Sequence, residues 1–242
     1  MRIEEVAGVL GDPARAGVIL DIDGTLAPIV PRPELSAVPA ATREAIGALV
    51  GRYAVVAVVS GRTTAEASTL VDVPGVVVEG LYGLEAPPLP ERVAAAAEEV
   101  VAATDGAWVE RKGGSVAVHL RGTHDPDAAE AEVVPRLARL AADEGLEVQL
   151  GKRVVELVPA GIPRKGAAVQ RLIVGAALDA ALYAGDDHAD LEAFAALDRL
   201  EAEGLRAVRV AVHGEETPTV VLEAADVVVE GPEHLAELLG SL

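Results

Sequence analysis

Four short polar motifs in this 242-residue sequence contain the side chains that phosphoryl-group chemistry requires. Their aspartates supply carboxylates, a serine supplies a hydroxyl, a lysine supplies a positive charge, and glycine turns expose backbone N–H groups. Together such groups describe a pocket for a phosphoryl group. The motifs are Asp21-Ile22-Asp23-Gly24-Thr25, Ser60-Gly61-Arg62, Pro163-Arg164-Lys165-Gly166 and Gly185-Asp186-Asp187.

The carboxylates of these motifs require a cation if they share one site. Close pairs among Asp21, Asp23, Asp186 and Asp187 would repel by roughly 4 kcal/mol each at an effective dielectric constant near 20. Without a cation, some of these groups would have to stay protonated. A set of oxygen ligands suits Mg²⁺. The sequence therefore predicts Mg²⁺ as a cofactor, with Lys165 as a second positive charge.

The segments around the motifs indicate a parallel sheet that can bring them together. Short, continuously apolar runs at 17–20, 53–59, 76–78 and 181–184 are typical of buried strands. Helical spacing at 39–52, 63–70, 164–175 and 189–202 separates them, and further strands are expected at 207–212 and 226–229 before a helix at 232–239. This alternation predicts a Rossmann-like, doubly wound α/β core. Ligands of such sheets bind beyond the carboxyl ends of the strands, where three of the motifs lie and beside which Lys165 opens a helix.

A segment of different character interrupts this pattern. After the proline-rich stretch at 86–90, alternating strands are expected at 115–121, 146–150 and 153–158, with helices at 91–104 and 126–144. We therefore predict a core domain formed by 1–85 and 160–242, with an inserted α+β domain at 86–159. Trp108 and Phe194 are expected to be core residues.

Composition limits the classes of partner. The formal net charge is −19, from 20 basic and 39 acidic residues, which argues against a nucleic-acid or anionic-membrane surface. Cysteine is absent, so disulfides and thiolate sites are excluded. No uncharged apolar run reaches the roughly 18 residues of a membrane span, and the acidic N-terminus does not resemble a signal peptide. We expect a cytoplasmic monomer.

The ordered motifs resemble those of the haloacid-dehalogenase-like phosphatases. The resemblance implies that Asp21 is a nucleophile that forms an aspartyl-phosphate, and that Asp23 is the general acid and base. Ser60 and Lys165 would hold phosphate oxygens. The implied Mg²⁺ ligands are Asp21, the Asp23 carbonyl and Asp186, with Asp187 and Asp190 in support.

The inserted domain is similar to a type-2 cap, the lid that selects substrate in this superfamily. Its motifs resemble those of the trehalose-6-phosphate phosphatase family. The segments that carry this resemblance are 26–29, 83–85, 110–115 with His119, and 151–156. The candidate substrate-binding residues are Gly61, Arg62, Glu110, Lys112, Ser115, His119 and Glu156.

The resemblance implies Mg²⁺-dependent hydrolysis of trehalose 6-phosphate to trehalose and phosphate. Three positions depart from the family pattern. Tyr82 stands where the family usually has histidine or asparagine, and Ala189 and Leu191 stand where it has threonine and glutamate. Two alternatives therefore stay open: a phosphatase of another phosphorylated sugar or glycosyl-glycerate, and a non-catalytic regulator that binds a phosphosugar.

Overall fold

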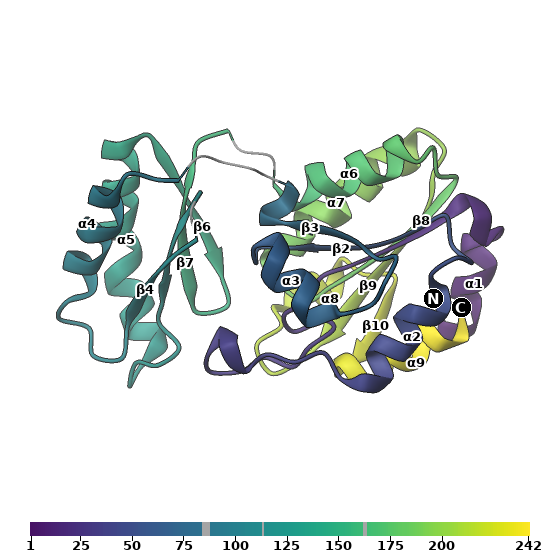
Figure 1. Cartoon of the computed structure of the whole chain (residues 1–242), viewed down its shortest axis with the longest axis horizontal. Helices are drawn as coiled ribbons and strands as arrows, with labels where there is room; N and C mark the ends of the chain where they lie inside the picture. The colour runs from purple at the N-terminus through teal and green to yellow at the C-terminus, as the bar shows by residue number, and fades with distance from the viewer. Residues whose placement is uncertain (84–87, 113, 162–163) are drawn as a thin grey trace. The chain divides into compact units, whose positions relative to one another are not determined.

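The chain forms two compact units in a computed structural model that describes residues 1–83, 88–112, 114–161 and 164–242. The first unit comprises Met1–Gly83 and Pro163–Leu242, and the second comprises Leu84–Ile162. The predicted domain boundary at 85/86 lies outside the described residues. So do four residues of the sequence motifs: Leu84, Glu85, Gly113 and Pro163. Figure 1 shows the elements of each unit.

The first unit is built on a six-stranded parallel sheet with the strand order β10-β9-β8-β1-β2-β3. All five residues of β1 and all six of β8 are buried, because helices cover both faces of the sheet. This burial explains the continuous apolar runs in the sequence. The strands are β1 (Ala16–Leu20), β2 (Val55–Ser60), β3 (Val77–Gly80), β8 (Ala180–Gly185), β9 (Arg206–His213) and β10 (Val227–Glu230).

Seven helices cover the two faces in the described part of this unit. One face packs against α1 (Ile3–Leu10), α2 (Ala40–Leu49), α3 (Thr64–Val71) and α9 (Gly231–Ser241). The other face packs against α6 (Lys165–Gly175), α7 (His188–Ala202) and α8 (Thr219–Glu223). In Figure 1, α6 and α7 lie on one side of the sheet and α2 and α9 on the other. Successive strand residues therefore contribute to two separate apolar clusters.

The second unit is a four-stranded antiparallel sheet with helices on one face. Its strand order is β4-β5-β7-β6, and α4 and α5 pack on the face that carries Val116, Val118, Val155 and Leu157. The opposite face carries alternate residues such as Glu110 and Glu156. The elements are α4 (Glu91–Val101), β4 (Trp108–Arg111), β5 (Val116–His119), α5 (Pro126–Glu144), β6 (Leu146–Gly151) and β7 (Val154–Pro159).

The predicted fold class, a doubly wound core with an inserted α+β domain, is confirmed. Three elements were not predicted: α1, α8 and the edge strand β4. Trp108 is half-buried and stacks on His119, so its expected place in a core is wrong, whereas Phe194 does lie in one. Among the described residues, no helix has the length and hydropathy that crossing a membrane requires.

Candidate active site

The polar motifs meet at one edge of the parallel sheet. Asp21 follows the last residue of β1, Ser60 ends β2, and Asp186 follows the last residue of β8. These three strands are adjacent and parallel, so their carboxyl ends lie together, as the strand pattern predicted. Lys165 is the first residue of α6, which packs against β2.

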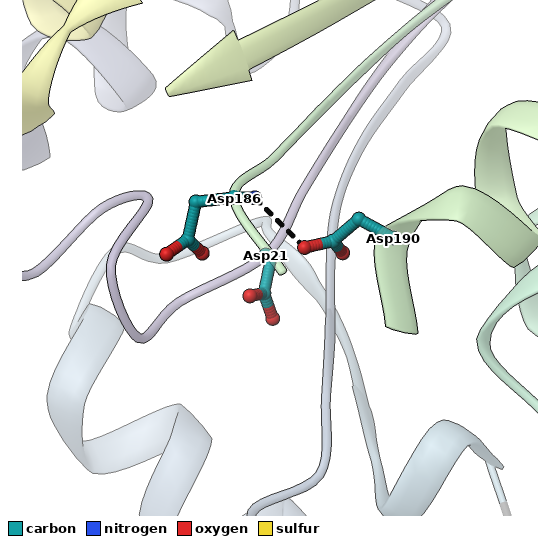
Figure 2. Close-up of side chains that lie close together, drawn as sticks. All are labelled: Asp21, Asp186 and Asp190. Carbon is teal, nitrogen blue, oxygen red and sulfur yellow. Dashed lines mark hydrogen bonds between the residues drawn. The ribbon is translucent and has the colours of Figure 1, made fainter. Parts of the chain in front are cut away.

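Three aspartates form a buried cluster at this edge. Asp21, Asp186 and Asp190 each offer a carboxylate oxygen, and these oxygens lie within 4.8 Å of one another. Figure 2 shows the three side chains and the hydrogen bond between Asp186 and Asp190. The close approach depends on Gly24, because a Cβ at that position would lie 1.9 Å from Asp186 Oδ2. Gly24 of the first motif therefore leaves the space that the Asp186 side chain of the fourth motif occupies.

Lys165 is buried among these carboxylates. Its Nζ lies 3.0 Å from Asp21 Oδ1 and 2.7 Å from Asp190 Oδ1. Burial alone would lower the pKa of Lys165, but attraction to Asp190 and Asp21 outweighs it and raises the pKa well above its ordinary value. Burial raises the pKa of Asp21 to about 7, although the Lys165 charge opposes this shift. The lysine therefore stays charged, and its charge offsets only part of the effect of burial on Asp21.

Asp190 connects the lysine to the loop that carries Asp186. Its Oδ1 accepts hydrogen bonds from Lys165 Nζ and from the Tyr183 hydroxyl, at 2.7 and 2.6 Å. Its Oδ2 accepts from the backbone N–H groups of Asp186 and Asp187, both at 2.8 Å. Because both oxygens are occupied by donors, Asp190 acts as a positioning residue here. Tyr183 is fully buried on β8, and its contribution was not predicted.

The donor set of this cluster fits a hard divalent cation. The ligands that Asp21 and Asp186 offer are carboxylate oxygens, which Mg²⁺ prefers. The pKa of Asp21 is raised mainly by burial, with repulsion from Asp190 adding to the shift and the Lys165 charge opposing it. A divalent cation would add positive charge to the cluster. Asp21 and Asp186 are thus the side chains that could hold Mg²⁺.

Asp23 and Asp187, which were also predicted near the metal, make other contacts in this structure. Asp23 forms a bidentate ion pair with Arg62, in which Nε lies 2.6 Å from Oδ2 and Nη2 lies 2.7 Å from Oδ1. Its Oδ1 also accepts a hydrogen bond from Ser36 Oγ at 3.2 Å. The Asp187 side chain accepts from the His188 N–H and caps the N-terminus of α7. Neither carboxylate belongs to the acidic cluster found among the described residues.

The loop after β2 holds the remaining predicted residues of this unit. Ser60 is buried, and its Oγ accepts a hydrogen bond from the Arg62 N–H at 3.2 Å. Gly61 lies against the side chain of Tyr82. The sequence therefore identified the loop, but the contacts of Arg62 with Asp23 and of Gly61 with Tyr82 were not predicted.

The predicted substrate-binding residues of the second unit form a polar cluster of their own. Ser115 Oγ donates to Glu156 Oε1 at 2.6 Å, and His119 Nε2 lies 2.7 Å from Glu110 Oε2. Lys112 Nζ lies 3.9 Å from Glu110 and 3.7 Å from Glu156. The two glutamates and His119 occupy the sheet face that α4 and α5 leave uncovered.

Comparisons with known proteins point in one direction. The family model described as trehalose-phosphatase matches residues 19–88 and 87–221. A trehalose-phosphate phosphatase of Mycobacterium marinum is 31% identical over 250 residues, covering 94% of this chain and 61% of that protein. An uncharacterized glycosyl hydrolase of Mycobacterium tuberculosis is 34% identical over 251 residues, covering 94% of this chain but 18% of its own length. The chain thus spans less than two thirds of the length of either relative.

Solved structures show the same fold. The C-terminal domain of a Candida albicans trehalose-6-phosphate phosphatase superposes with a TM-score of 0.82 at 20% identity, covering 99% of this chain and 96% of that one. A haloacid dehalogenase-like hydrolase from Bacteroides thetaiotaomicron gives a TM-score of 0.64 at 15% identity, covering 93% and 98%. The match to the family model covers most of the sequence, and we conclude that the chain belongs to the trehalose-phosphatase family.

Proposed function

We propose that this chain is a Mg²⁺-dependent phosphoric monoester hydrolase that releases phosphate from trehalose 6-phosphate. The observation that supports this most directly is the environment of Asp21, a buried carboxylate 3.0 Å from the Lys165 ammonium and beside Asp186. Family membership supports the substrate. Mg²⁺, when bound by Asp21 and Asp186, would neutralise negative charge on the transferring phosphoryl group.

The proposed reaction has two displacements. An Asp21 oxygen attacks phosphorus, the bond from phosphorus to the sugar oxygen breaks, and Asp23 gives its proton to the leaving alkoxide. A water then attacks the aspartyl-phosphate, Asp23 takes a proton from that water, and phosphate leaves with the Asp21 carboxylate restored. Lys165 and Ser60 would hold phosphoryl oxygens through both steps.

Asp23 must change partners for this chemistry. Both Asp23 oxygens accept hydrogen bonds from Arg62 in the present structure. Proton transfer therefore requires this ion pair to open. Opening would release the Nε–Nη2 edge of Arg62 from Asp23, and that edge of a predicted substrate-binding residue could then meet an anionic substrate.

We place sugar recognition on the polar cluster of the second unit. Glu110, Lys112 and Glu156 offer carboxylates and an ammonium that can hydrogen-bond sugar hydroxyls, and Ser115 and His119 already orient the two glutamates. Replacing Glu110 or Glu156 with glutamine should raise KM for the sugar phosphate more than it lowers kcat. An unchanged KM would contradict this assignment.

The test of the proposed function is phosphate release from a panel of substrates. The panel contains trehalose 6-phosphate, glucose 6-phosphate, mannose 6-phosphate and a glycosyl-glycerate phosphate, each with Mg²⁺ and with excess EDTA. Trehalose 6-phosphate should give the highest kcat/KM, and EDTA should abolish turnover. A higher kcat/KM for another sugar phosphate of the panel would make that compound the proposed substrate. If no compound of the panel released phosphate, the proposed function would be overturned.

A further inference from the structure

The turn that follows β3 has an unusual backbone. Leu81, Tyr82 and Gly83 adopt φ values of +48°, +57° and +76°, so three successive residues are left-handed. Among the described residues, Leu81 and Tyr82 are the only neighbouring non-glycine residues with positive φ. Side chains with a Cβ adopt this conformation at a cost, and such strain persists only where surrounding contacts enforce it.

Contacts from two elements of the site hold this turn in place. The Leu81 N–H donates to the Arg62 carbonyl at 2.8 Å, which joins the turn to the loop after β2. Arg171 of α6 donates to Glu79 at 2.8 Å and to the Tyr82 carbonyl at 3.4 Å. The turn is therefore fixed against both the Ser60–Arg62 loop and the helix that begins at Lys165.

The Tyr82 side chain extends into the space between these two elements. The centroid of its ring lies 5.9 Å from Lys165 Nζ, within range of a cation–π interaction. At the other end of the ring, a Cβ added to Gly61 would lie 2.9 Å from the Tyr82 hydroxyl oxygen. The Lys165 ammonium thus contacts the carboxylates of Asp21 and Asp190 and has the Tyr82 ring as a third neighbour.

We propose that Tyr82 is a positioning residue for Lys165, and that the strained turn exists to deliver its ring to that lysine. The ring face restricts where the ammonium can go and keeps it directed toward Asp21, where a phosphoryl group would bind. This inference rests on the proposed function, since it takes Lys165 to be a ligand of phosphate. It also gives a physical role to a position at which the sequence departs from the family pattern.

The test compares two substitutions that separate the ring from its hydroxyl. Tyr82→Phe keeps the aromatic face, and Tyr82→Leu keeps apolar bulk but removes that face. The readout is the affinity of the full chain for inorganic phosphate in the presence of Mg²⁺, measured by calorimetry. We expect Tyr82→Leu to weaken phosphate binding about tenfold, a loss of about 1.4 kcal/mol. Tyr82→Phe should stay within about twofold of the unchanged chain.

Tyr53→Leu is the matched control, because Tyr53 is a buried tyrosine of the cluster on the opposite face of the sheet. Its phosphate affinity should be unchanged, although its melting temperature will fall. Steady-state kinetics on trehalose 6-phosphate should show the same order, with kcat/KM lowered in Tyr82→Leu and restored in Tyr82→Phe.

Two results would overturn the inference: no phosphate binding by the unchanged chain, or equal phosphate affinity in Tyr82→Leu. In the second case, a lower thermal stability of Tyr82→Leu would assign the ring a packing role only. Phosphate binding that depends on the Tyr82 ring, in a chain that hydrolyses no sugar phosphate, would support the inference while the proposed function fails.

Discussion

Asp21, the proposed nucleophile, is a buried carboxylate with one ammonium close to it. Burial holds its pKa at about 7, and Lys165 at 3.0 Å is the nearest positive charge. The same burial that makes ionisation costly also keeps water away from the carboxylate. A cation at this site would favour the charged form of Asp21, so under the proposed function metal binding would increase its reactivity.

Asp21→Asn tests the nucleophile directly. The amide has nearly the same shape but cannot form an acyl phosphate, so phosphate release should fall by at least about 10³-fold, the scale on which removal of an essential group is felt. The melting temperature should stay within a few degrees of the unchanged chain. Asp72→Asn, an exposed aspartate in a left-handed cap of the same unit, is the control and should retain full turnover. Retained turnover in Asp21→Asn would refute the nucleophile assignment.

Tyr183→Phe tests the hydrogen bond that fixes Asp190. The hydroxyl donates to a buried carboxylate at 2.6 Å, and hydrogen bonds to charged groups contribute about 1.5–3 kcal/mol. We expect the free energy of unfolding to fall by about that amount, with a lower kcat because Asp190 also holds Lys165. Urea unfolding and phosphate release measure the two effects, with Tyr53→Phe as the control. An unchanged urea midpoint would show that the hydroxyl contributes nothing.

At this scale, the sequence predicted that residues of different motifs lie at one sheet edge, but not which side chains pair. Two of the predicted metal-site carboxylates, Asp23 and Asp187, lie outside the acidic cluster. Asp21, Ser60 and Asp186 follow strands whose apolar runs are readable, so their meeting at one sheet edge follows from topology. The ion pair of Asp23 with Arg62 and the hydrogen bond of Tyr183 with Asp190 depend on side-chain rotamers and on distances of a few ångströms. No periodicity in the sequence encodes such contacts.

Several elements of both units were predictable because each carries a strong, local pattern. β1 and β8 are uninterrupted apolar segments, and α5 has regular helical spacing with Asp125 as its N-cap. β4 was missed because it is a short edge strand, half-buried and partly polar, which alternation alone does not reveal. α1 was missed because only Val6 and Leu10 of its eight residues are buried.

The start of two neighbouring strands is tied by an ion pair that should respond to pH. Arg15, just before β1, donates to both oxygens of Asp179, just before β8, and this hydrogen bonding lowers the pKa of Asp179 below its usual value near 3.8. The unfolded chain therefore takes up a proton at higher pH than the folded one. The stabilisation is present above pH 3.8 and is lost as pH falls through the lowered pKa of the folded state.

We accordingly expect Asp179→Asn to lower the urea midpoint at pH 7 and pH 5, with a difference from the unchanged chain that shrinks below pH 4. The effect should be small because both side chains are largely exposed. It should also diminish in high salt. A difference that stays constant from pH 7 to pH 3.5 would show that the carboxylate charge is not its source.

For the whole molecule, the net charge of −19 does not describe the local charge balance of the candidate site. The overall charge argues against polyanionic partners such as nucleic acid. The site takes its properties from a buried lysine, a candidate cation position and carboxylates within a few ångströms of one another. Several of the acids that make up the net charge are therefore the groups proposed to handle a phosphorylated substrate.

Each of the two units has its own apolar core, which predicts that they lose structure separately. Leu182 is buried in the first unit, and Leu137 is buried in the second. Replacing either leucine with alanine should lower the free energy of unfolding of its own unit by about 2–5 kcal/mol, because a cavity remains where the side chain was. Since a domain with its own core can open independently, the loss should be local.

Hydrogen exchange with mass spectrometry distinguishes separate opening of one unit from unfolding of the whole chain at once. Leu137→Ala should accelerate exchange in 88–161 and leave β8 protected, and Leu182→Ala should do the reverse. Both variants make the same chemical change in fully buried positions, so each is the matched control for the other. Equal acceleration across both units in either variant would mean that the chain unfolds as one cooperative block. Substitutions in the polar cluster of the second unit would then also lower the stability of the first unit.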